Sequence, residues 1–195
     1  QLKGLIDHLK LTEPFTLMGL SMGGAVSMRF ASLYPAMVKS LVLVDAYGIS
    51  TPNDPIMLIT RPKYLGEALI GSVGGPFIKV ATGIGVKEPK NHVGFKQWFL
   101  APMSKERSKR AILSSLRNLM TEDLLPDINR VEVLPINKLI VWGEHDKVLP
   151  LKYGKQLHCK IPSARMEVFE ESGHIPHYEE PDRFNELISG FVREH

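Results

Sequence analysis

The chain has 195 residues, enough to bury a hydrophobic core and form one domain with an insertion. With 44% hydrophobic residues, 23% charged residues and a net charge of +3, its composition is typical of a globular protein. Its basic residues are scattered except at Lys105, Arg107, Lys109 and Arg110, a spacing typical of a solvated helix face, so we expect no nucleic-acid partner. The single cysteine, Cys159, excludes an intrachain disulfide, and we expect a cytoplasmic protein.

No uncharged apolar run is long enough to span a bilayer, so we expect no stable membrane insertion. The nearest candidate, residues 64–86, contains Glu67, Lys79 and many glycines, and is better interpreted as buried or pocket-lining chain. No Cys/His cluster has zinc spacing and no Gly-rich phosphate loop is visible, so we expect no metal and no organic cofactor.

In the first quarter of the chain, helical and strand patterns alternate. The sequence predicts a helix over residues 1–11, a strand over Phe15–Met18, a helix over Met22–Leu33 and a strand over Val38–Val44. The last of these has a continuously apolar core, as expected for a parallel strand that is covered on both faces.

The next segment, residues 48–133, has a different character. Glycines punctuate short apolar runs, and two helices are predicted further on, over Lys105–Met120 and Asp123–Ile128. The segment is far longer than one crossover connection needs. We therefore expect a helical cap or lid inserted into a core made of residues 1–47 and 134–195, and its apolar composition favours a hydrophobic substrate pocket.

The alternation returns after the cap. The pattern predicts a strand over Ile136–Trp142, a helix over Leu151–His158, a strand over Arg165–Phe169 and a helix over Asp182–Glu194. The expected fold is therefore α/β, with a mostly parallel sheet and helices on both faces. Polar residues follow the strand ends, where open parallel sheets place their chemistry.

The first of these polar sites is a Gly-x-Ser-x-Gly sequence that runs from Gly19 to Gly23, between a predicted strand and a predicted helix. In this context the pattern is typical of a nucleophile elbow with Ser21 at the apex. The backbone N–H of Met22 would then face a developing oxyanion. The alternative is a glycine-rich turn in which Ser21 only caps the helix.

Ser21, Asp146 and His174 follow three different strands, in the chain order expected when the serine occupies an elbow. A hydroxyl needs a base to act as a nucleophile at neutral pH, and a carboxylate can orient that base. Asp45 is a rival for the acid and His177 for the base. Asp146 could instead cap the turn that follows it.

Three stretches, residues 19–24, 141–150 and 172–181, resemble the α/β-hydrolase superfamily. Within it, the chain is similar to small esterases and to hydrolases of meta-ring-fission products. The resemblance implies Ser21 as nucleophile, Asp146 as acid, His174 as base and the Met22 N–H as an oxyanion donor. Serine at the elbow argues against dehalogenases and epoxide hydrolases, which have aspartate there.

The resemblance also implies that this chain is the C-terminal part of the fold. In the family about four strands precede the helix in which Gln1 lies, and a loop among them supplies the second oxyanion donor. We expect that segment to lie outside this sequence, to be supplied by another chain, or to have been removed. Without it the chain by itself is expected to be catalytically incomplete.

From these residues we expect a serine hydrolase that cleaves an apolar ester or similar carbonyl substrate through an acyl-enzyme. One alternative is hydrolysis of a carbon–carbon bond in a ketone produced by meta ring fission. Another is a ligand-binding member of the fold that is not an enzyme.

Overall fold

The computed structural model describes residues 1–49, 85–88, 105–118 and 123–194. The chain divides into two compact units, one of Gln1–Ile49 with Leu124–His195 and the other of Ser50–Asp123. Most of the glycine-rich part of the predicted cap, and with it the expected apolar pocket, lies outside the described residues. In the second unit the structure describes one helix, α7 (Glu106–Asn118).

The first unit contains a parallel sheet of four strands in the order β1-β2-β3-β4. The strands are β1 (Phe15–Leu20), β2 (Val38–Val44), β3 (Asn137–Gly143) and β4 (Arg165–Phe169). All three strand pairs are parallel, so the carboxyl ends of the strands lie at one edge of the sheet. The turns that carry the polar motifs all leave the sheet from this edge.

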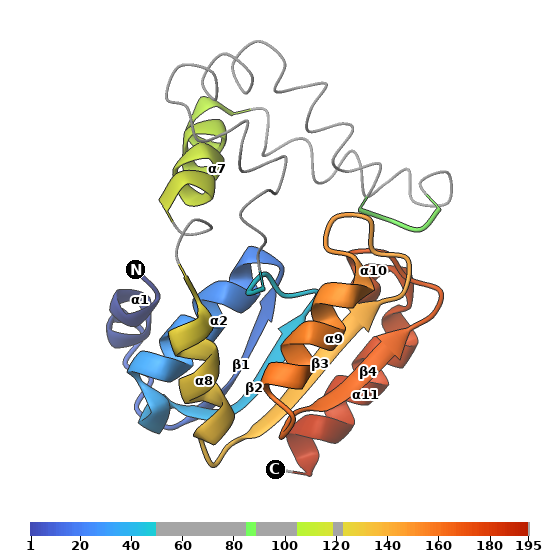
Figure 1. Cartoon of the computed structure of the whole chain (residues 1–195). Helices are drawn as coiled ribbons and strands as arrows, with labels where there is room; N and C mark the ends of the chain where they lie inside the picture. The colour runs from blue at the N-terminus through green and yellow to red at the C-terminus, as the bar shows by residue number, and fades with distance from the viewer. Residues whose placement is uncertain (50–84, 89–104, 119–122, 195) are drawn as a thin grey trace. The chain divides into compact units, whose positions relative to one another are not determined.

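Helices cover both faces of the sheet, and Figure 1 shows α2, α8 and α9 on one face and α11 on the other. The helices and short turns of this unit are α1 (Leu2–His8), α2 (Met22–Leu33), η1 (Pro35–Met37), α8 (Leu125–Val133), α9 (Leu151–Lys160), α10 (Pro176–Glu179) and α11 (Pro181–Arg193). The expected α/β fold with helices on both faces is confirmed. Among the residues the structure describes, no helix combines the length and apolar character that crossing a bilayer requires.

Alternate side chains of the strands build two hydrophobic layers, since neighbouring residues of a strand point to opposite faces. On the α11 face, strand residues pack against Phe184 and Phe191 of that helix. On the other face, the ring of Trp142 lies against Gly154 of α9. The strand members of the first layer are Val42, Val44, Leu139, Val141 and Phe169.

The helix α8 belongs to the first unit, although the sequence placed residues 125–133 at the end of the cap segment 48–133. It packs against α2, with Ile128 and Val131 fully buried. The buried Asp127 carboxylate forms an ion pair with Arg29 of α2, with 2.7 Å between Asp127 Oδ2 and Arg29 Nε. An apolar stripe with its own ion pair ties α8 to the sheet unit, so the second unit ends at Asp123 rather than at residue 133.

The strands β2 and β4 and the helix α2 begin and end where the sequence predicted them. The first helix ends at His8 rather than at residue 11, and the left-handed backbone of Lys10, with φ 53°, explains the early stop. The short helix predicted over Asp123–Ile128 instead runs from Leu125 to Val133.

Candidate active site

Ser21 lies at the junction of β1 and α2, with φ 52° and ψ −120°. This conformation is strained for a residue with a side chain and costs about 1–3 kcal/mol. Backbone hydrogen bonds hold it: the Ser21 N–H donates to Val44 at 2.9 Å, and the Ser21 carbonyl accepts from Gly24 and Tyr47, each at 2.9 Å. The fold therefore fixes the apex of the turn by its main chain.

Close packing around this turn explains one of its glycines. A Cβ at Gly19 would overlap the backbone of Gly23 and lie 2.5 Å from the Ser27 hydroxyl. A Cβ at Gly23 would meet no atom of the described residues within 4 Å. Gly19 thus allows the strand and the helix to approach each other, whereas packing within the described part of the chain does not require a glycine at position 23.

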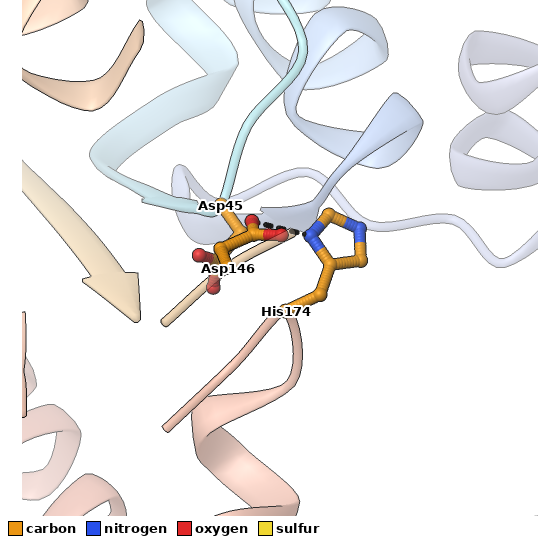
Figure 2. A group of neighbouring side chains, drawn as sticks. All are labelled: Asp45, Asp146 and His174. Carbon is orange, nitrogen blue, oxygen red and sulfur yellow. Dashed lines mark hydrogen bonds and ion pairs between the residues drawn. The ribbon is translucent and has the colours of Figure 1, made fainter. Parts of the chain in front are cut away.

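Asp146 and His174 are in direct contact (Figure 2). His174 Nδ1 lies 2.7 Å from Asp146 Oδ2, and the Asp146 side chain is fully buried while that of His174 is 12% exposed. Because a carboxylate only accepts hydrogen bonds, Nδ1 must carry the proton and Nε2 is left to accept one. A neutral histidine oriented in this way can act as a general base.

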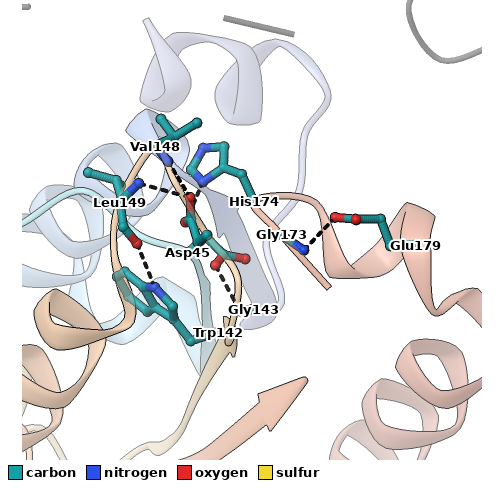
Figure 3. A network of polar contacts seen from close by, with 9 residues as sticks. Asp45, Trp142, Gly143, Val148, Leu149, Gly173, His174 and Glu179 are labelled. Atoms are coloured by element: carbon teal, nitrogen blue, oxygen red, sulfur yellow. Dashed lines mark hydrogen bonds and ion pairs between the residues drawn. The ribbon is translucent and has the colours of Figure 1, made fainter. Parts of the chain in front are cut away.

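The second oxygen of Asp146 is held by the loop that follows β3. Asp146 Oδ1 accepts from the N–H groups of Val148, at 2.7 Å, and Leu149, at 2.9 Å. The carbonyl of Leu149 in turn accepts from the indole of the buried Trp142 at 2.8 Å. These contacts, drawn in Figure 3, fix the orientation of the carboxylate relative to the sheet.

The histidine loop is held by two glutamates that follow it. Glu179 accepts from the Gly173 N–H at 2.8 Å, as drawn in Figure 3. Glu180 accepts from the buried Ser172 hydroxyl at 2.7 Å. The carbonyl of Ser172 accepts from the His145 N–H at 3.0 Å, which joins this loop to the acid loop. The two loops thus form one hydrogen-bonded structure.

Asp45, the residue after β2, is fully buried and has φ 41°. Its Oδ1 accepts from the Gly143 N–H at 2.9 Å, and its Oδ2 has no hydrogen-bond partner. Burial, followed by the negative charge of Asp146, raises the pKa of Asp45 well above its ordinary value. His174 contacts Asp146 rather than Asp45, so the geometry assigns the two carboxyls different positions.

Asp45, Asp146 and His174 also form a group of metal-ligating type, with one ligand atom of each within 4.8 Å of the others. Both oxygens of Asp146 already accept hydrogen bonds from the protein. A cation would have to displace these donors from a site where both carboxylates are buried. The arrangement therefore fits a proton better than a metal ion.

Among the described residues, the hydroxyl of Ser21 makes no hydrogen bond with His174. Such bonds tighten when substrate binds, so this separation does not remove His174 as the base. The rival His177 is turned away, with its ring packed edge-on against Phe184 of α11 at 5.8 Å between ring centres. Partial burial and the neighbouring His174 lower the pKa of His177.

The sequence did not identify Glu179 and Glu180 as supports, although both lie in the stretch that carries the family resemblance. Asp45 was considered only as a rival acid. An acidic residue directly after the continuously apolar run of residues 41–44 was the signal that could have shown a buried partner there.

Comparison with known proteins shows to which family this chain belongs. The model of the alpha/beta hydrolase family matches residues 1–187. The chain belongs to this family. The expected α/β-hydrolase fold is thereby confirmed.

A curated relative, an uncharacterized protein of Mycobacterium tuberculosis, is 29% identical over 97% of this chain and 59% of its own length. The 2-hydroxy-6-oxo-6-phenylhexa-2,4-dienoate hydrolase of Comamonas testosteroni is also 29% identical, over 98% of this chain and 67% of its own length. A solved structure of a thermophilic esterase from Thermogutta terrifontis matches with a TM-score of 0.81 and 24% identity, over 99% of this chain and 70% of that one. This alpha/beta hydrolase chain thus spans between 59% and 70% of the length of these proteins.

Proposed function

We propose that this chain carries the active site of a serine hydrolase that cleaves an apolar ester or similar carbonyl substrate. In this proposal Ser21 is the nucleophile, His174 is the general base, and Asp146 is the acid that orients His174. The N–H of Met22 is one donor to the oxyanion. The chemistry needs no metal and no organic cofactor.

In the first half-reaction, the Ser21 hydroxyl oxygen attacks the substrate carbonyl carbon and its proton passes to His174 Nε2. The tetrahedral intermediate collapses, the bond to the leaving alcohol breaks, and the alcohol takes the proton from His174. In the second half-reaction, His174 removes a proton from water, which attacks the acyl group on Ser21. The acid is released and Ser21 regains its proton.

The observation that carries the proposal is the hydrogen bond of 2.7 Å between His174 Nδ1 and Asp146 Oδ2. Donors from the protein occupy both oxygens of Asp146, so this carboxylate is held as an acceptor for the imidazole. The strained, main-chain-fixed conformation of Ser21 is further support, because strain of this kind gathers at functional sites.

The proposed oxyanion site uses the start of α2. Met22 is the first residue of this helix, so its N–H has no acceptor within the helix, and the helix dipole favours negative charge there. Removing one oxyanion donor of this kind typically lowers the rate by about 10²–10³-fold.

A second candidate is hydrolysis of a carbon–carbon bond in a meta-ring-fission product. The relative from Comamonas testosteroni, 29% identical over 98% of this chain, is named for such a reaction. Turnover of a 2-hydroxy-6-oxohexa-2,4-dienoate, compared with turnover of p-nitrophenyl esters, separates the two. Preference for short, charged acyl groups would contradict the apolar pocket.

The test is labelling with a fluorophosphonate, which reacts with activated serines, followed by peptide mass spectrometry. We expect one adduct, on Ser21, and none in Ser21→Ala. The matched control is Ser27→Ala, since Ser27 is a buried serine of α2, six positions after Ser21, and should not affect the reaction. Equal labelling of Ser21→Ala would contradict the assignment of Ser21 as the nucleophile. A folded protein that gives no adduct would contradict the proposal and favour a ligand-binding protein.

A further inference from the structure

The carboxyl group of Asp45 has no part in the proposed reaction, yet it is fully buried beside the site. Its side chain is 0% exposed and follows β2 in a left-handed backbone conformation, which aspartate and asparagine tolerate better than most residues. One oxygen accepts a hydrogen bond from the Gly143 N–H. The other, Oδ2, has no partner, and an unpaired buried oxygen is costly.

Two further groups face Asp45 at close range. One oxygen of Asp45, one oxygen of Asp146 and a ring nitrogen of His174 all lie within 4.8 Å of one another. Figure 2 shows the three side chains together. The negative charge of Glu179 also raises the pKa of Asp45. Two ionised carboxylates this close would repel strongly in a buried site, whereas two carboxyls that share one proton attract.

The energetics agree with this geometry. Burial raises the pKa of Asp45 most, and the negative charges of Asp146 and Glu179 raise it further. The hydrogen bond from Gly143 opposes them only in part. Asp146, by contrast, accepts three hydrogen bonds from the protein, so its oxygens are oriented as acceptors.

We infer that Asp45 is a positioning residue that keeps its proton at neutral pH and donates it in a hydrogen bond to Asp146. Asp45 then holds Asp146 from the sheet side, while Val148 and Leu149 hold it from the loop. The site carries one negative charge instead of two, and the imidazole of His174 faces a fixed carboxylate. This inference extends the proposed function, because it assumes that Asp146 and His174 act as an acid–base pair.

Two variants with compatible backbones test the inference. In Asp45→Asn the amide can accept from Gly143 and donate to Asp146, as a protonated carboxyl does. In Asp45→Gly the Gly143 N–H loses its acceptor and Asp146 loses the proposed donor, while its bonds to Val148, Leu149 and His174 remain. Both residue types tolerate the positive φ. We expect the rate of labelling by the fluorophosphonate to fall at least tenfold in Asp45→Gly and Asp45→Asn to restore it to within about threefold of the wild type.

A measurement that needs no reaction at Ser21 accompanies these rates. The infrared spectrum of the wild type at pH 8 should contain the C=O stretch of a protonated carboxyl, and the spectrum of Asp45→Asn should lack it. The acidic midpoint of labelling against pH should be equal in the wild type and Asp45→Asn, because neither has a charge at position 45. Prior treatment with a chelator should change none of these results.

Several outcomes would overturn the inference. The first is an infrared spectrum of the wild type without the band of a protonated carboxyl. The second is a labelling rate that falls as much in Asp45→Asn as in Asp45→Gly, or that does not fall in Asp45→Gly. The third is an acidic midpoint of labelling that is about one pH unit lower in Asp45→Asn than in the wild type. Loss of activity on chelation would instead indicate a cation. If the band is present but the wild type is never labelled, the proposed function fails and the inference about the proton stands.

Discussion

At the end of β3, Gly143 lies so close to Gly173 that a Cβ on the first would overlap the carbonyl oxygen of the second. Gly143 leads into the acid loop, and Gly173 precedes His174 in the histidine loop. The distance between acid and base in the proposed site is therefore set partly by the absence of a side chain at Gly143.

Replacing Gly143 with alanine should force these two loops apart. Overpacking against a backbone atom typically costs about 1–3 kcal/mol, and the hydrogen bond between Asp146 and His174 should lengthen. We expect a lower midpoint in urea denaturation and a loss of fluorophosphonate labelling in the molecules that remain folded. Gly190→Ala in α11 is the control, since its Cβ would meet nothing within 4 Å, and it should be neutral or stabilising.

The two glycines of the nucleophile elbow should respond differently to alanine. Gly19→Ala places a Cβ on the backbone of Gly23 and should destabilise the fold by several kcal/mol or prevent folding, because neither the strand nor the helix can yield. Gly23→Ala meets no atom and should retain the fold, with a small gain from helix propensity. Circular dichroism during urea titration distinguishes the two, and equal behaviour would contradict the packing of the elbow.

Much of the sheet unit could be predicted from the sequence, because periodicity and strand-terminal motifs are local signals. The apolar run before Asp45 and the pattern from Met22 to Leu33 each gave the observed bounds. The sequence could not predict that α8 belongs to the sheet unit. Its place depends on tertiary contacts such as the ion pair of Arg29 with Asp127, about 100 positions apart in the chain.

The same division applies to the site. The types of residue and their order indicated Asp146 and His174, and the structure brings these two together. The environment of Asp45 was not visible in the sequence, because a shifted pKa depends on burial and on groups that come from distant strands. Local patterns identify candidates for an acid, but only the fold shows which carboxyl contacts the imidazole and which is hidden behind it.

Changing the acid to its amide should remove the proposed base without removing its hydrogen bond. In Asp146→Asn the donors Val148 and Leu149 would hold the amide oxygen, so the amide nitrogen would face His174 Nδ1. His174 Nδ1 would then have to accept a hydrogen bond from the amide, so the imidazole proton would move to Nε2, the nitrogen that must be free to act as the base. We expect labelling of Ser21 to fall about 10³–10⁴-fold with little change in stability.

The same acid-to-amide change at Asp45 is the matched control for Asp146→Asn. It should leave the tautomer of His174 unaltered, which nitrogen-15 spectra of the imidazole can report. Equal loss of labelling in both variants would mean that the two carboxyls are not distinguished in the way the hydrogen bonds indicate.

The raised pKa of Asp45 predicts how stability depends on pH. In the unfolded chain this carboxyl releases its proton near its ordinary value of 3.8, whereas the folded protein retains the proton to higher pH. The folded state thus binds more protons above about pH 4, and the contribution of Asp45 to stability falls as pH rises until its folded pKa is reached. Below about pH 4 that contribution is fully present.

Asp45→Asn isolates this contribution, because asparagine does not titrate. The free energy of unfolding of the variant, minus that of the wild type, should increase as the pH rises above about 4, by up to about 1.4 kcal/mol per pH unit, until the folded pKa of Asp45 is reached. Urea denaturation of both proteins at a series of pH values measures the difference, and other carboxylates cancel from it. A difference that stays constant with pH would mean that Asp45 titrates alike in the folded and unfolded chain, and one that decreases would mean that it is ionised and stabilised by its surroundings.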